Sequence, residues 1–232
     1  CELTPKGIVT DPELCTLCGT CAEVCPTKAS EITGQLISKE EIFAKIENER
    51  VFFDQSGGGV TFSGGEPLQY AEYLIEVLDE CGARGIHRVV DTSGLAKTET
   101  LLKVASRTDH FLYDLKLMDS AKHKAWTGVP NEKILENLQI LAETGAQINI
   151  RIPLIKGVNA DEENIRATAA FVAGLAGEKK TVNLLPYHNI AARKYQKLGG
   201  KYDSGEMKEP SEVEQQRCVE IFAEHGLEAI IG

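Results

Sequence analysis

From Ser38 onward, the chain alternates short apolar runs with longer amphipathic stretches, and this alternation constrains the fold more than any other feature. Six runs have the length and composition of strands: GVTF, HRVVD, HFLYD, INIRIPLI, TVNLLP and LEAII. The stretches between them carry apolar residues at helical spacing. Because strands that alternate with helices of this size form a parallel sheet, we expect an α/β fold, a partial (β/α)6 TIM-like barrel.

Local signals mark several helix boundaries. Ser38 is followed three residues later by Glu41, which is a capping-box pattern. Asn131 precedes the periodic stretch NEKILENLQILAETG and is the expected N-cap of that helix. A further helix is expected from Leu68 to Cys81.

Composition limits the classes of function. With 232 residues and 42% hydrophobic residues, the chain can form one sizeable core and a small additional module, which we assign to residues 36–232 and 1–35. A net charge of −10 argues against nucleic acid as a partner, because phosphate binding needs clustered basic residues. No apolar run is long enough to cross a membrane, so the expected location is the cytoplasm.

The N-terminal segment carries a cysteine run. The letters CTLCGTCAEVCP place Cys15, Cys18, Cys21 and Cys25 before a proline, in the Cys-x2-Cys-x2-Cys-x3-Cys-Pro pattern of bacterial ferredoxins. The spacing predicts thiolate ligands of a 4Fe–4S cluster, with either Cys1 or Cys25 as the fourth ligand of the cluster that the other three begin. A zinc knuckle or a set of disulfides is the alternative.

Polar residues gather where five successive predicted strands end, in SGGEP, DTSG, YDLK, RIP and PYH. The carboxyl ends of barrel strands converge on one rim, so these residues are expected to surround a single pocket. Taken singly, each group also has a structural interpretation. Gly64 and Gly65 suit a turn, Asp91 and Ser93 suit helix caps, and the prolines suit strand ends.

This ordered set of motifs, with HKAWTG and IRIPLIKGVN between them, resembles the glycyl-radical-enzyme activating enzymes of the radical S-adenosylmethionine (SAM) superfamily. The resemblance covers nearly the whole chain and is to the pyruvate formate-lyase-activating-enzyme-like branch with a ferredoxin-type insert. It implies that a reduced 4Fe–4S cluster and SAM generate a 5′-deoxyadenosyl radical, which installs a glycyl radical on a partner enzyme. It also implies flavodoxin or ferredoxin as electron donor.

One part of the family pattern is missing. The superfamily holds its catalytic cluster with Cys-x3-Cys-x2-Cys, whereas Cys21 and Cys25 are followed at the next required position by Lys28. The resemblance implies that the triplet and the first barrel strand lie upstream of Cys1. We therefore expect an N-terminally truncated fragment that contains no catalytic residue and is inactive alone.

The resemblance assigns roles to individual residues. Main-chain groups of Gly64 and Gly65 and the carboxylate of Glu66 would accept hydrogen bonds from the methionyl ammonium. Lys116, Arg151 and His188 would contact other parts of the cofactor. The full expected SAM set is Gly64, Gly65, Glu66, Asp91, Ser93, Asp114, Leu115, Lys116, Arg151 and His188. A monovalent cation site is expected at Asp91, Thr92 and Asp114.

Other features give weaker predictions. Trp126, the only tryptophan, suits core packing, or alternatively docking of the partner. His87 and His110 begin strands, on the barrel end associated with stability. The basic stretch 194–201 suits a solvated face or a partner-facing loop.

Two other classes of function remain open at this point. A strand-end lysine beside a carboxylate also suits a Schiff-base barrel enzyme that uses Lys116. The chain could instead be a non-catalytic electron-transfer or binding module in which only the cysteine segment is functional.

Overall fold

The computed structural model describes residues 2–4, 7–11, 13–32, 34, 36–178, 180–188, 205 and 207–232. Cys1 and the basic stretch 194–201 lie outside the described residues. Residues up to Phe43 fall in one compact unit, and Ala44–His188 with the described residues from 205 onward fall in a second.

The second unit is built on one parallel sheet of six strands, β3-β4-β5-β6-β7-β8, in sequence order. The strands are β3 (Gly59–Phe62), β4 (His87–Thr92), β5 (His110–Asp114), β6 (Ile148–Leu154), β7 (Thr181–Pro186) and β8 (Ala229–Ile231). Each predicted apolar run forms its strand, which confirms the expected α/β fold.

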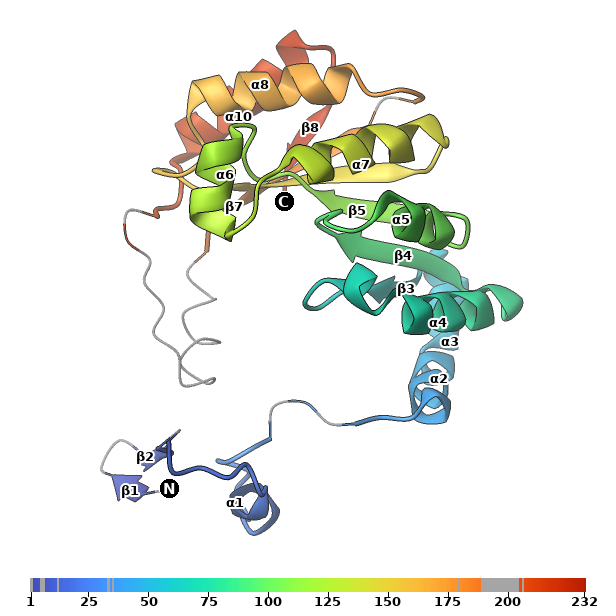
Figure 1. Ribbon diagram of the computed structural model, residues 1–232, viewed down its shortest axis with the longest axis vertical. Helices are drawn as coiled ribbons and strands as arrows, with labels where there is room; N and C mark the ends of the chain where they lie inside the picture. The colour runs from blue at the N-terminus through green and yellow to red at the C-terminus, as the bar shows by residue number, and fades with distance from the viewer. Residues whose placement is uncertain are drawn as a thin grey trace. The chain divides into compact units, whose positions relative to one another are not determined.

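Helices connect these strands and cover one face of the sheet (Figure 1). They are η1 (Pro67–Tyr70), α4 (Ala71–Ala83), α5 (Thr98–Ala105), α6 (Ser120–Thr127), α7 (Glu132–Glu143), α8 (Glu162–Ala173) and α10 (Glu212–Glu224). α2 (Lys39–Asn48) and α3 (Arg50–Ser56) precede the first strand of the sheet.

The core lies between this face of the sheet and the helices. Strand residues such as Val90, Tyr113 and Ile150 are fully buried there, together with helix residues such as Leu101 and Leu138. Successive strand residues point to opposite faces of a sheet. The strand residues that alternate with these core residues therefore project to the other face, where they are half-buried.

The two predicted helix starts, at Ser38 and Asn131, are both found, and the predicted side-chain capping is present at Ser38. The Ser38 N–H donates a 2.9 Å hydrogen bond to Glu41 Oε2, and the Glu41 N–H donates a 3.2 Å hydrogen bond to Ser38 Oγ. Together these two bonds form the predicted capping box. Ser211 and Glu214 form a second capping box on α10. Asn131 is the N-cap of α7, as expected, but its side chain makes no capping hydrogen bond. Its Nδ2 donates instead to the carbonyls of Leu117 and Met118.

Two helices of the second unit, α3 and α6, were not predicted, and α6 shows why. Its sequence, SAKHKAWT, has no apolar stripe. The helix is defined instead by its ends, since Asp119 Oδ1 accepts a 2.7 Å hydrogen bond from Lys122 N and Gly128 ends the helix at φ +85°. Its buried side chain is His123, whose Nδ1 lies 2.7 Å from the Val129 carbonyl.

The N-terminal unit contains a hairpin of β1 (Glu2–Thr4) and β2 (Gly7–Val9) and the single-turn helix α1 (Thr20–Glu23). α1 ends before Cys25, and this cysteine lies in no helix. No described residue between 9 and 32 is buried, and Leu14 and Leu17 are 80% and 86% exposed. This segment therefore has no apolar core of its own among its described residues.

Candidate functional site

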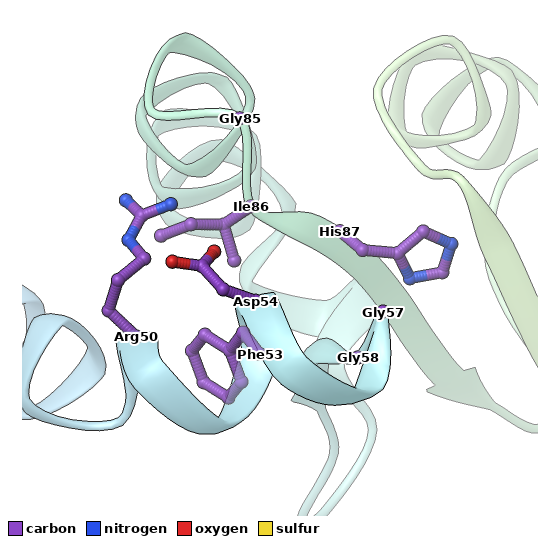
Figure 2. Close-up of a pocket in the computed structure, with 8 residues that line it drawn as sticks. All are labelled: Arg50, Phe53, Asp54, Gly57, Gly58, Gly85, Ile86 and His87. Carbon is purple, nitrogen blue, oxygen red and sulfur yellow. The ribbon is translucent and has the colours of Figure 1, made fainter.

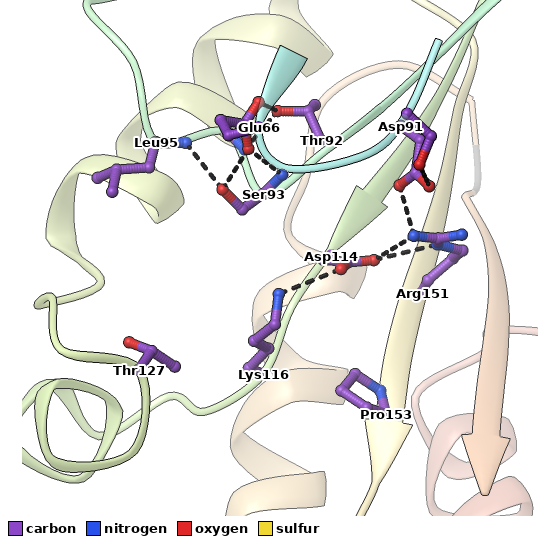
Figure 3. Close-up of polar contacts among 12 residues, drawn as sticks. Glu66, Asp91, Thr92, Ser93, Leu95, Asp114, Lys116, Thr127, Arg151 and Pro153 are labelled. Carbon is purple, nitrogen blue, oxygen red and sulfur yellow. Dashed lines mark hydrogen bonds and ion pairs between the residues drawn. The ribbon is translucent and has the colours of Figure 1, made fainter. Parts of the chain in front are cut away.

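Four charged side chains from neighbouring strands meet at the carboxyl end of the sheet (Figure 3). The Arg151 guanidinium on β6 pairs with Asp91 of β4 and with Asp114 of β5, whose Oδ1 lies 3.0 Å from Nε and 2.9 Å from Nη2. Lys116 Nζ lies 3.1 Å from Asp114 Oδ2. We call these four residues the ionic group.

Strand register explains this meeting. Asp114 is the register partner of Arg151 across β5 and β6. Both alternate with core residues, so their side chains share the face of the sheet that the core leaves free. The ionic side chains are only 16–35% exposed. Since they are partly desolvated, each charge depends on its partners more than a surface ion pair does.

A glycine loop adjoins the ionic group. Gly64 and Gly65 follow β3 with φ of +87° and +51°, and a Cβ on either would meet nothing within 4 Å. The positive φ accounts for glycine at both positions, and the open space leaves the main chain accessible. Ser63 Oγ donates a 2.8 Å hydrogen bond to Asp91 Oδ2, which ties the loop to the ionic group.

Glu66 ends this loop and faces the turn that follows β4. Its Oε1 accepts hydrogen bonds from Thr92 Oγ1 at 2.6 Å and Leu68 N at 3.2 Å. Its Oε2 accepts from Ser93 N at 2.9 Å and Ser93 Oγ at 2.6 Å. Asp91 and Ser93 therefore do not cap the next helix, as their simplest structural interpretation required. The N-cap of α5 is Lys97.

The turn after β4 is supported from behind by a residue that we did not single out from the sequence. Asn137 of α7 is fully buried, and its Nδ2 donates to the carbonyls of Gly94 and Ala96 at 2.8 and 2.9 Å. Its Oδ1 accepts from Thr98 Oγ1 at 2.8 Å. The available signal was an asparagine on the buried stripe of an otherwise apolar helix face.

Two other members of the expected set lie differently. The Leu115 side chain is 3% exposed and packs in the core, so only its main chain is available to a ligand. The His188 side chain is 58% exposed and its Nδ1 lies 3.9 Å from Glu209 Oε1. It follows β7, at the same end of the sheet, and its described contact is outside the ionic group.

The predicted cluster ligands Cys15, Cys18, Cys21 and Cys25 are all described, and none of these four forms a disulfide. Within the described residues, no three His, Cys, Asp or Glu side chains are gathered as a metal site. Hydrogen bonding from Thr20 lowers the pKa of Cys18, and hydrogen bonding from Thr27 lowers the pKa of Cys25. Both shifts favour the thiolate form that binds metals.

Trp126 is 48% exposed on α6, so the core-packing interpretation of this residue is wrong. Its helix follows the strand end that carries Lys116, and Figure 3 shows Thr127, at the end of that helix, near the same rim. The docking alternative therefore stays a prediction.

A shallow pocket of about 260 Å³ lies at the opposite end of the sheet (Figure 2). It is lined by residues before β3 and at the start of β4: Arg50, Phe53, Asp54, Gly57, Gly58, Gly85, Ile86 and His87. Because barrel enzymes place their sites at the carboxyl ends of the strands, we do not assign the active site to this pocket.

Comparison with known proteins decides the family. The Radical SAM superfamily model matches residues 14–169. The trans-4-hydroxy-L-proline dehydratase activating enzyme of Clostridioides difficile is 42% identical, over 98% of this chain and 85% of that protein. This chain belongs to the radical SAM superfamily.

Within the superfamily, the similar proteins are activating enzymes of glycyl radical enzymes. The choline trimethylamine-lyase activating enzyme of Oleidesulfovibrio alaskensis is 40% identical over 87% of this chain and 76% of its own length. A solved domain of a pyruvate-formate lyase-activating enzyme from Bacteroides vulgatus is 47% identical with a TM-score of 0.66, over 75% of this chain and 99% of that domain. These matches confirm the prediction of a glycyl-radical-enzyme activating enzyme with a partial barrel, and the ferredoxin-type segment stays a prediction.

Radical SAM proteins use a 4Fe–4S cluster and SAM, so the expected cofactors are confirmed at the level of the family. The matches support an activating enzyme over a Schiff-base barrel enzyme or a non-catalytic electron-transfer module.

None of the helices in the described part of the chain is long and apolar enough to span a bilayer.

Proposed function

We propose that this chain holds SAM at the carboxyl ends of its strands and serves in the activation of a glycyl radical enzyme. The proposal rests on one observation: the exposed Gly64–Gly65 loop lies next to the ionic group and is linked to it by the hydrogen bond from Ser63 to Asp91. When bound, the reduced 4Fe–4S cluster and SAM supply a 5′-deoxyadenosyl radical that removes hydrogen from a glycine of the partner.

The residues present fit the cofactor's methionyl end. The loop offers accessible main-chain carbonyls to an ammonium, and Lys116 and Arg151 offer cations to a carboxylate. In this proposal, Asp91 and Asp114 orient those two cations. Ser93 holds the turn, Leu115 contributes its main chain, and His188 contacts the adenosine.

The expected monovalent cation fits this arrangement poorly. The carboxylates of Asp91 and Asp114 are already paired with Arg151 and Lys116. The Thr92 side chain lies on the core face and donates to Glu66. We therefore assign the positive charge at this position to the two side chains and leave the cation out of the proposal.

For the cysteine segment we propose an auxiliary 4Fe–4S cluster held by Cys15, Cys18 and Cys21, with Cys25 or Cys1 as fourth ligand. Two observations support it. The donor set consists of thiols, two of which have lowered pKa values. The described part of the segment also buries no residue, so metal–sulfur bonds are a suitable source of its stability.

The partner and the electron donor are also proposals. The relatives named above act on a hydroxyproline dehydratase and a choline lyase, so we propose a glycyl radical enzyme of this kind as the protein substrate. We propose a flavodoxin or ferredoxin as reductant, the cytoplasm as location, and no role for nucleic acid or membrane.

Anaerobic reconstitution tests the function. We expect this chain to bind one 4Fe–4S cluster whose reduced EPR signal does not change when SAM is added. A protein extended upstream should gain a second cluster whose reduced EPR signal does change. In the extended protein, Lys116→Met should weaken SAM binding, whereas Lys103→Met on the exposed surface of α5 should not. Zinc in place of iron, or an extended protein that never responds to SAM, would refute the proposal.

A further inference from the structure

The acceptor capacity of the Glu66 carboxylate is fully used within the protein. A carboxylate offers about four acceptor positions in total. In Glu66 these accept from Thr92 Oγ1, Leu68 N, Ser93 N and Ser93 Oγ. A ligand ammonium could bind this carboxylate only by displacing one of these donors.

Displacement is costly here. The two hydroxyl donors lie 2.6 Å from the carboxylate, within the range of short hydrogen bonds to a charged acceptor, which are stronger than neutral ones. Thr92 is only 2% exposed and its hydroxyl oxygen already accepts from Gly94 N at 2.9 Å, so the hydroxyl proton would lose its acceptor without gaining water.

The main-chain carbonyls of the loop are in the opposite situation. Among the described residues, no donor reaches the carbonyl oxygens of Gly64 or Gly65. Both glycines are exposed, and space beside them is open. The acceptors available to an ammonium are therefore these carbonyls.

We infer that Glu66 is a positioning residue, which latches the glycine loop to the turn after β4, and that the loop carbonyls bind the ammonium. This inference rests on the proposed function and replaces the direct role expected for the Glu66 carboxylate. The turn that receives the latch is rigid, because Asn137 holds the carbonyls of Gly94 and Ala96 from α7. Glu66 thus connects the loop, through Ser93, to a fixed point in the core.

Variants of Thr92 distinguish a positioning role of Glu66 from direct binding of the SAM ammonium by its carboxylate. In the reconstituted extended protein, Thr92→Val keeps the side-chain shape but removes the hydroxyl, and Thr92→Ser keeps the hydroxyl. A latch predicts that Thr92→Val and Glu66→Gln each weaken SAM binding about tenfold in calorimetry, while Thr92→Ser binds nearly as well as the wild type. A direct ligand predicts that Thr92→Val frees an acceptor position on Glu66, so that SAM binding holds or improves. That result would overturn the inference.

Hydrogen exchange gives a second test that needs no SAM. The amides of Leu68 and Ser93 donate to Glu66, so Glu66→Gln should speed their exchange in the SAM-free protein, with the buried amides of Leu138 and Leu141 in α7 as the unaffected reference. Unchanged exchange at both amides would also overturn the latch. If the wild-type extended protein failed to bind SAM, the proposed function would be refuted, whereas this exchange comparison would still decide the role of Glu66.

Discussion

Gly94 shows how a single residue limits the site. A Cβ at this position would overlap the hydroxyl of Tyr113, which is buried and donates a 2.7 Å hydrogen bond to the Ile134 carbonyl. Burial raises the pKa of Tyr113, so the hydroxyl stays protonated and remains a donor. The turn after β4 therefore approaches β5 and α7 more closely than any residue but glycine allows.

Comparison of Gly94→Ala with Gly145→Ala isolates the free energy of unfolding that is lost through the overlap with Tyr113. Both glycines have left-handed φ, +75° and +77°, but a Cβ at Gly145 would meet nothing within 4 Å. We expect Gly145→Ala to cost about 1–2 kcal/mol for the backbone conformation alone. Gly94→Ala should cost at least about 2 kcal/mol more, because Tyr113 must move. Equal losses in urea unfolding would show that the overlap is relieved without cost.

At the level of elements, amphipathic helices are held by their buried side. In α5, Leu101 is fully buried, whereas its neighbour Leu102 is 37% exposed. We expect Leu101→Ala to destabilise the protein by about 2–5 kcal/mol, since it removes a buried side chain and leaves a cavity. Leu102→Ala should cost less than about 1 kcal/mol. Urea unfolding of the two variants provides the comparison, and similar losses would contradict the assignment of the helix face.

The same reasoning explains which elements were predictable. The strands and α4, α5, α7, α8 and α10 have clear periodicity and were expected. α6 escaped prediction because it has caps but no apolar stripe, and α3 because it is short and buries no residue. Short elements of this kind depend on local hydrogen bonds and tertiary contacts rather than on pattern.

At the level of the whole molecule, the two units differ in how much of their described sequence is buried. The barrel unit has an apolar core, whereas the described residues between 9 and 32 bury nothing. If a cluster holds the cysteine segment, removal of iron should make trypsin cleave after the exposed Lys28 on the order of tenfold faster or more. Cleavage after the exposed Lys124 of α6 should not change. Equal rates at Lys28 with and without iron would contradict a metal-dependent fold of this segment.

The sequence by itself determined the α/β fold, the order of its strands and most residues of the candidate site, including Asp91, Asp114 and Arg151. It could do so because hydrophobic period and strand-end position are local properties, and parallel strands bring their ends together. Only the tertiary structure decided how hydrogen-bond donors are distributed among acceptors. It placed the Thr92 hydroxyl on Glu66 and Asn137 behind the turn, because a side chain's partners depend on segments 26 and 43 residues away in the chain.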